Sequence, residues 1–246
     1  MLLIHDNQIL SWSSHIELDL VNFCNKNCRD CSRCCDRFPA DKSEFLSVGA
    51  VQEFVRDSII LGKVWLHIGC LGGEPTLHPC FDEIMNELKV YKEWSPSTRI
   101  WMMTNEKVKR KTPDFLEVCN SHVHDRHHAF YVSPLDLKCQ NENFHCQAIG
   151  CGIGLGTLGY MPCVLGTAMG RVWGIKGIGR LVEATRSNLL SLSSLLCRHC
   201  GWRLVDVNDY WKGKIFDFPR GHATLSWKKK EEEYKARRLI ISSNTR

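Results

Sequence analysis

Short apolar segments alternate with amphipathic segments along the first 132 residues, and this alternation constrains the fold more than any other feature. Apolar residues two apart predict strands, and apolar residues three or four apart predict helices. The predicted strands are residues 15–23, 63–70, 99–103 and 128–132, and the predicted helices are residues 43–61, 79–91 and 113–118. A strand followed by a helix and another strand indicates parallel pairing with a right-handed crossover. We therefore expect an α/β fold. Because only four strands are clear, an open, partial (β/α) barrel is favoured over a closed barrel.

The loops that follow these predicted strands carry the unusual residues of the chain. The first strand runs into CNKNCRDCSRCC (24–35), the second into LGGEPTLHP (71–79), the third into Thr104 and Asn105, and the fourth into Ser133. Ligands of α/β folds bind at the carboxyl ends of parallel strands, which lie along one edge of the sheet. The sequence therefore predicts one binding site built from these loops.

The chain has fourteen cysteines, and their setting predicts metal binding rather than disulfides. Residues 1–14 lack the basic region and the cleavage site of a signal peptide. No apolar run approaches the roughly 18 residues of a membrane span. We therefore expect a cytoplasmic protein that does not bind a membrane, in which clustered cysteines favour metal binding. The net charge of +5 comes from basic residues interleaved with acidic ones, which does not indicate nucleic-acid binding.

The first cysteine cluster has the order Cys24-x3-Cys28-x2-Cys31 directly after a predicted strand. Three thiolates on one short loop can hold three irons of a [4Fe-4S] cluster and leave the fourth iron open for chemistry. The competing interpretation is a closed tetrahedral zinc site that also uses Cys34. Zinc sites more often show two separated cysteine pairs, which this segment alone does not.

Together with Gly72-Gly73-Glu74-Pro75 one strand later, this triplet resembles the radical S-adenosylmethionine (SAM) superfamily. The resemblance implies a [4Fe-4S] cluster on the three cysteines and SAM on its open iron, with a reducing partner such as flavodoxin or ferredoxin. It also implies that residues 72–75 bind the methionyl ammonium. Glycines allow close approach of the backbone, and a carboxylate complements an ammonium group.

Three further residues are similar to polar positions of that superfamily that face SAM or substrate: Thr104, Asn105 and Ser133. The alternative is that small polar residues simply end a strand. One position departs from the pattern, because an aromatic residue usually precedes the third cysteine and this chain has Asp30 there. The adenine contact of the family is therefore not carried over. Cys70, just before the GGEP loop, is a candidate hydrogen-atom donor, although a buried core role is favoured for a strand cysteine.

A second cysteine set follows residue 138 and resembles the twitch module, the short form of the SPASM domain. Its candidate ligands are Cys146 or Cys151, then Cys163, Cys197 and Cys200. The resemblance implies a second, auxiliary [4Fe-4S] cluster, and a four-cysteine zinc site is the competitor. The glycine-rich stretch 151–163 predicts a hairpin, and residues 223–239 predict a charged helix.

We expect three units: a partial radical SAM barrel (1–137), a twitch-like module (138–204) and a C-terminal extension with a helix (205–246). The resemblance implies an enzyme that reductively cleaves SAM to a 5′-deoxyadenosyl radical, which removes a hydrogen atom from a substrate. A net oxidation of a small molecule is the first expectation, and peptide crosslinking or epimerisation is the second. A non-catalytic zinc-binding interaction protein is the alternative of a different class.

Overall fold

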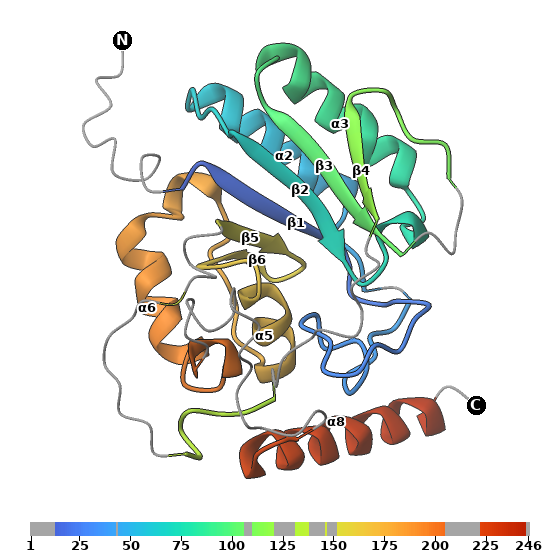
Figure 1. Cartoon of the computed structure of the whole chain (residues 1–246), viewed down its shortest axis with the longest axis vertical. Helices are drawn as coiled ribbons and strands as arrows, with labels where there is room; N and C mark the ends of the chain where they lie inside the picture. The colour runs from blue at the N-terminus through green and yellow to red at the C-terminus, as the bar shows by residue number, and fades with distance from the viewer. Residues whose placement is uncertain are drawn as a thin grey trace.

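A single mixed sheet of six strands organises the computed structural model (Figure 1). The structure describes residues 13–42, 44–105, 110–120, 131–137, 146, 152–204 and 222–244. The strands are β1 (His15–Val21), β2 (His67–Gly72), β3 (Arg99–Thr104), β4 (Leu116–Asn120), β5 (Ile153–Gly156) and β6 (Gly159–Met161). Their order across the sheet is β4-β3-β2-β1-β5-β6. Every neighbouring pair is parallel except β5 and β6, which form an antiparallel hairpin.

The helices are α2 (Val48–Ile60), α3 (Phe81–Trp94), α5 (Gly166–Trp173), α6 (Arg186–Leu196) and α8 (Leu225–Asn244). Three short 3₁₀ helices accompany them: η1 (Pro75–Leu77), η2 (Leu181–Glu183) and η3 (Gly201–Leu204). The first three predicted strands, the first two predicted helices and the hairpin are thus confirmed, with boundaries shifted by a few residues. None of the helices in the described ranges is long and apolar enough to cross a membrane.

The predicted helix over residues 113–118 is wrong, because Leu116–Asn120 form strand β4 beside β3. The segment alternates between apolar and polar residues, and its Glu117 pairs with Arg99 on β3. Pairing with the neighbouring strand therefore decides the conformation of a segment too short for periodicity to settle. Of the predicted strand 128–132, residues 128–130 lie outside the described residues, and Tyr131 and Val132 are not in a strand.

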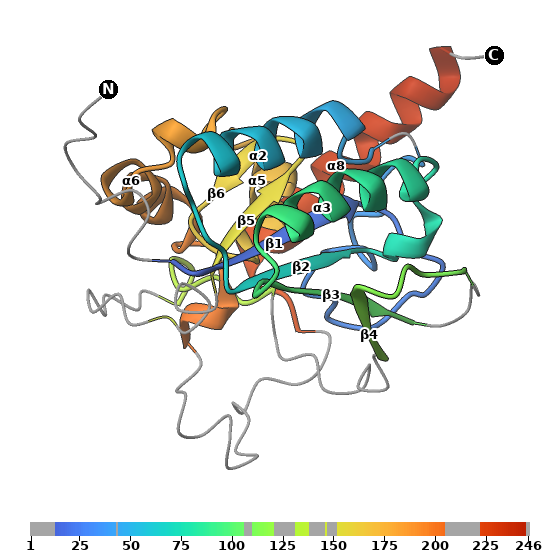
Figure 2. The same cartoon turned by 90° about the horizontal axis from the view of Figure 1, so that it is seen from above.

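Helices α2 and α3 lie side by side on one face of the sheet, which we call the helix face (Figures 1 and 2). Alternate β1 residues, Ile16, Leu18 and Leu20, point into this layer and pack with Phe54 of α2 and Leu88 of α3. All five are almost completely buried. Burial of each such side chain stabilises the fold by about 1.5–3 kcal/mol, so the helix face holds the main core.

Successive strands are added to the sheet first on one side of β1 and then on its other side. Strands β2, β3 and β4 follow β1 on one side, whereas β5 pairs with the other side of β1 in parallel. The predicted hairpin is therefore part of the same sheet as the first three strands. On the face opposite the helix face, a second apolar cluster joins α5 and α8 to the cysteine loop through Met169, Trp227 and Phe38. The three-unit division at residues 137 and 204 stays a prediction.

Tyr91 provides a test of the main core. Its buried hydroxyl accepts a hydrogen bond from the Trp65 backbone N–H (2.9 Å) and donates one to the Lys63 carbonyl (2.7 Å). Tyr91→Phe leaves both backbone groups without this partner. We expect the free energy of unfolding, measured by urea titration, to fall by about 1–3 kcal/mol.

The matched control is Tyr234→Phe, since the Tyr234 hydroxyl donates to the Pro39 carbonyl at an exposed position. Water can replace that bond, so we expect a loss of less than about 1 kcal/mol. Equal losses in the two variants would contradict the role assigned to Tyr91.

Candidate functional site

The first cysteine loop follows β1 at the edge formed by the carboxyl ends of β1, β2, β3 and β5, which we call the carboxyl edge. Cys24, Cys28 and Cys31 are all partly exposed. Burial raises the pKa of Cys24 and Cys28, and the charge of Cys31 adds to both shifts. Hydrogen bonds from the Cys35 thiol and from the Cys35 and Arg33 backbones lower the pKa of Cys31 to about 7, against the effect of burial. The three thiols are therefore close enough to influence one another.

This proximity does not by itself define a metal site. Within the described residues, no group of three or more His, Cys, Asp or Glu side chains is arranged closely enough to hold a metal ion. The chemistry of the donors nevertheless suits a metal. Three thiols lie on one short loop, and the Cys31 thiol, with a pKa of about 7, is partly ionised to the thiolate at neutral pH. Thiolates are the ligands that iron–sulfur clusters and zinc prefer.

Two glycines bring the GGEP loop against the start of the cysteine loop. The Gly73 N–H donates to the Val21 carbonyl at 2.7 Å, and the Glu74 N–H donates to the Phe23 carbonyl at 3.0 Å. A Cβ at Gly73 would lie 1.9 Å from the Phe23 carbonyl oxygen, and Gly72 has a φ of +120°. Only glycine fits this contact. The second predicted motif is thereby joined directly to the first.

Glu74 is the centre of the carboxyl edge. Its side chain is 1% exposed. One carboxylate oxygen, Oε1, accepts from the Thr76 hydroxyl (2.6 Å), the Thr76 N–H (3.2 Å) and the Thr104 hydroxyl (2.7 Å). The other, Oε2, accepts from the Asn105 N–H at 2.8 Å. Each carboxylate oxygen has about two acceptor positions. The three donors to Oε1 share its two positions, whereas Oε2 has one described donor and can accept from a further one.

Asn105 connects this carboxylate to the cysteine loop. Its side-chain amide donates to the Cys24 sulfur at 3.6 Å and to the Asn25 side-chain oxygen at 2.7 Å. The predicted residues Cys24, Glu74, Thr104 and Asn105 are therefore brought together. They come from the ends of three neighbouring strands, as the strand pattern predicts.

A buried charge network, which the sequence analysis missed, holds the other side of the cysteine loop. Arg33 forms ion pairs with Glu17 (2.7 Å) and Asp19 (3.1 Å) of β1 and donates to the Val164 carbonyl. Burial opposes the charge of Arg33, but Asp19 and Glu17 outweigh it and raise its pKa. Burial raises the pKa of both carboxyls, and Arg33 opposes that shift. The alternation of acidic and apolar residues in HIELDLV was the available signal.

Helix α5 completes this network. The Thr167 hydroxyl donates to the Asp19 carboxylate, and Arg171 donates to the carbonyls of Phe38 (2.8 Å) and Arg33 (3.2 Å). The cysteine loop is therefore tied both to β1 and to the helix that follows Cys163.

The second cysteine set lines one small pocket. Cys146, Cys163, Cys197 and Cys200 border it together with the apolar side chains of α5 and α6. Burial raises the pKa of Cys163 to about 12, and the charges of Cys146 and Cys197 add to the shift. Burial also raises the pKa of Cys200, and the charges of Cys163, Cys146 and Cys197 add to that shift. Cys151, the other candidate for the first ligand, lies outside the described residues.

Other predicted residues have contacts that are structural. Cys70 is completely buried in the core of the helix face, and burial raises its pKa to about 12. Ser133 donates to the Arg198 carbonyl at 2.9 Å and accepts nothing from the Glu74 cluster among the described contacts. Pro75 is buried as the first residue of η1. Asp30 is buried with a φ of 58°, and its N–H donates to Asp36 at 2.9 Å.

Comparisons of the chain with protein-family models and with curated proteins find no match. Among solved structures, BtrN in complex with AdoMet and 2-DOIA is 15% identical, with a TM-score of 0.48 over 78% of this chain and 94% of BtrN. BtrN in an open conformation is 13% identical, with a TM-score of 0.46 over 79% and 98%. Streptococcus suis SuiB bound to precursor peptide SuiA is 16% identical, with a TM-score of 0.36 over 44% and 24%. At these values, the similarities assign neither a family nor an activity to the chain.

The Arg33 network predicts that replacing Arg33 lowers the free energy of unfolding much more than replacing the nearby Arg37. Arg33→Met leaves two buried carboxylates without their cation, which we expect to lower the free energy of unfolding by about 3–5 kcal/mol. Arg37 forms a partly exposed ion pair with Glu231 at 2.9 Å, so Arg37→Met is the control, with an expected loss of about 1 kcal/mol or less. Urea titration of both variants is the measurement. A loss for Arg33→Met no greater than the control would show that the network does not stabilise the fold.

Proposed function

We propose that this protein is a radical SAM enzyme. In this proposal, Cys24, Cys28 and Cys31 hold a [4Fe-4S] cluster, and the GGEP loop binds the methionyl group of SAM. The observation that carries the proposal is the direct junction of the two motifs. Glu74 is hydrogen-bonded to Asn105, which in turn contacts the Cys24 sulfur at 3.6 Å. A ligand that is bound by both an iron and a carboxylate requires the cysteine loop and Glu74 to lie next to each other.

The environment of Glu74 supports an ammonium contact. Four hydrogen bonds from neighbouring residues hold its carboxylate in one position, and Oε2 keeps acceptor capacity. A carboxylate that is fixed before the ligand arrives loses little conformational entropy on binding. In this proposal Thr104 positions Glu74, and the Asn105 side chain orients the sulfur of Cys24.

When bound, the reduced cluster would supply one electron that cleaves SAM to methionine and a 5′-deoxyadenosyl radical, which removes a hydrogen atom from the substrate. The protein's own task is to bind SAM and substrate in fixed positions and to exclude water. The buried residues around Arg33 serve this task by fixing the loop that would hold the cluster. Because Cys70 is buried in the helix-face core, we assign it no hydrogen-donor role.

We further propose that Cys146, Cys163, Cys197 and Cys200 hold an auxiliary [4Fe-4S] cluster. Their convergence on one pocket supports a shared metal, and the thiol donor set suits iron–sulfur chemistry. An auxiliary cluster can accept an electron from a substrate radical, so a net oxidation of a small molecule is the proposed reaction. A peptide is the second candidate substrate. The proposal includes a twitch-like module over residues 138–204, a flavodoxin or ferredoxin as electron donor and a cytoplasmic location.

A zinc-binding interaction protein is the alternative, and the same cysteine pocket favours it, since four thiolates also suit zinc. Anaerobic purification followed by metal and sulfide analysis separates the two. We expect a brown protein with about eight irons per chain, as two [4Fe-4S] clusters require. Replacing Cys24, Cys28 and Cys31 together with Ala should leave about four irons and abolish formation of 5′-deoxyadenosine from SAM.

Cys80→Ala is the matched control for the triple variant, because Cys80 is also partly exposed but begins helix α3 away from both cysteine sets. It should keep the full iron content and SAM cleavage. A colourless protein that contains zinc and no iron would overturn the proposal. SAM cleavage that persists in the triple variant would overturn the assignment of the cluster to the first loop.

The proposed role of Glu74 in binding the ammonium group of SAM is tested by removing its charge. Glu74→Gln removes the charge that complements an ammonium group, so we expect the affinity for SAM, measured by equilibrium binding to the iron-loaded protein, to fall by about tenfold or more. Thr104→Val is the control, because it removes one hydrogen bond to Glu74 and keeps the carboxylate. If Thr104→Val weakens SAM binding as much as Glu74→Gln, the role of Glu74 is to hold the strand ends rather than to bind the ligand.

A further inference from the structure

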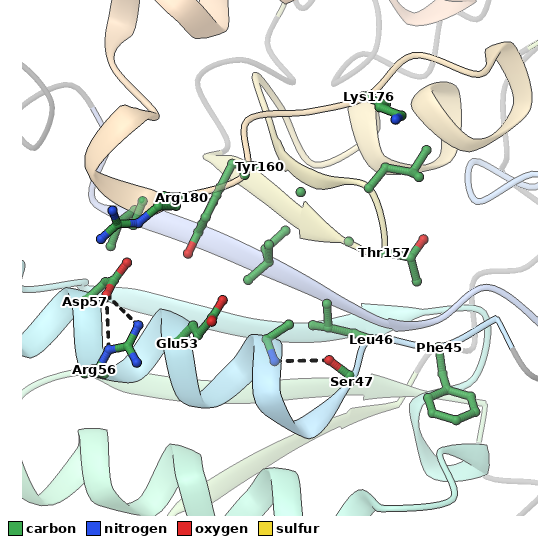
Figure 3. Close-up of a pocket in the computed structure, with 17 residues that line it drawn as sticks. Phe45, Leu46, Ser47, Glu53, Arg56, Asp57, Thr157, Tyr160, Lys176 and Arg180 are labelled. Carbon is green, nitrogen blue, oxygen red and sulfur yellow. Dashed lines mark hydrogen bonds and ion pairs between the residues drawn. The ribbon is translucent and has the colours of Figure 1, made fainter.

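A second pocket lies on the helix face, between α2 and the β5–β6 hairpin (Figure 3). Its volume is about 670 Å³, within the range of small-molecule sites. It lies beside the pair β1–β5, where the order of the strands reverses, and residues 155–157 at the carboxyl end of β5 line it. Open α/β sheets bind ligands preferentially at such a reversal. The cysteine loop is anchored to Glu17 and Asp19 on the opposite face of β1, so this pocket is separate from the proposed SAM site.

Tyr160 supplies the polar group that points to a ligand. The residue is 3% exposed, and its backbone is paired with Ile178 through hydrogen bonds of 2.8 and 2.9 Å. Its hydroxyl is directed into the pocket (Figure 3) and has no hydrogen-bond partner among the described residues. Burial raises its pKa, and the charges of Asp57 and Glu53 add to the shift, so the hydroxyl stays protonated. The hydroxyl therefore has its proton available for an acceptor on a bound ligand.

Opposite charges lie around this hydroxyl. Glu53 and Asp57 project from α2 on one side, and Arg180 lies on the other (Figure 3). Asp57 pairs with Arg56 at 3.3 Å, whereas Glu53 and Arg180 form no ion pair within the described part of the chain. A guanidinium and a phenol hydroxyl suit a carboxylate, and two carboxylates suit an ammonium group. One end of the pocket therefore matches a ligand that carries both charges.

Away from these charges, the apolar side chains of Leu46, Ala50, Leu155 and Leu158 line the pocket, with Ser47, Thr157 and Lys176 among them. We propose that this pocket binds a free α-amino acid with an apolar side chain. The ligand carboxylate accepts hydrogen bonds from Tyr160 and Arg180, its ammonium group contacts Glu53 and Asp57, and its side chain packs on the leucines. This assignment does not rest on the proposed radical chemistry.

The test is a titration of the protein with L-phenylalanine, in which ligand-observed NMR measures binding. N-acetyl-L-phenylalanine lacks the ammonium group and L-phenylalanine amide lacks the carboxylate, so we expect each to bind about tenfold more weakly or worse. Tyr160→Phe should weaken L-phenylalanine binding by about three- to tenfold, as the loss of one hydrogen bond implies. Arg180→Gln should remove the preference for the free carboxylate, and Glu53→Gln should reduce the preference for the free ammonium group.

Two matched controls separate these effects from general changes in charge or stability. Tyr234→Phe removes a phenol hydroxyl on α8, and Arg186→Gln removes an exposed cation on α6; neither residue lines the pocket. Both variants should bind L-phenylalanine as the unmodified protein does. No binding of L-phenylalanine, or equal binding of the free and blocked forms, would overturn the proposal. Because the titration uses neither SAM nor a reductant, its failure leaves the proposed SAM cleavage untouched.

Discussion

The buried carboxylate of Glu74 is the interaction on which the carboxyl edge depends. An ionised carboxylate removed from water is costly unless hydrogen bonds replace its hydration. Here the replacement comes from Thr76, Thr104 and Asn105, which belong to η1 and to the end of β3. Satisfying this one group therefore fixes the relative positions of two strand ends and the turn between β2 and α3. The Asn105 side chain extends the constraint to Cys24.

Side chains, rather than regular structure, hold the cysteine loop. The loop has neither helix nor strand between residues 24 and 35, so its backbone contributes few of the contacts that restrain it. Asn105 binds it on one side, and Arg33 anchors it to β1 on the other. The same arginine donates to the carbonyl of Val164, the residue after Cys163. Together with the bonds from Arg171 to the carbonyls of Phe38 and Arg33, this contact ties the first cysteine loop to the segment that contains Cys163.

The parts of the site that could be predicted are those encoded locally. The strand period placed Cys24, Glu74 and Asn105 at the ends of parallel strands, and parallel strands end on the same edge. What joins them depends on contacts that local patterns do not contain, since the Glu74 to Thr104 bond spans 30 positions. The strand Leu116–Asn120 was missed for the same reason, because its pairing with β3 decides a segment that is too short to have a clear period.

The glycines of the hairpin explain how one segment serves two faces of the sheet. At Gly154, a Cβ would lie 2.8 Å from the Thr167 methyl group, so the absence of a side chain is what lets α5 approach the sheet and Thr167 reach Asp19. The neighbouring Leu155 and its cross-strand partner Tyr160 point the other way, toward α2, and line the second pocket. Alternation along a strand separates the two faces at every residue. A larger residue at Gly154 would therefore meet Thr167 and Cys163 on the α5 side, whereas the side chains of Leu155 and Tyr160 line the second pocket on the α2 side.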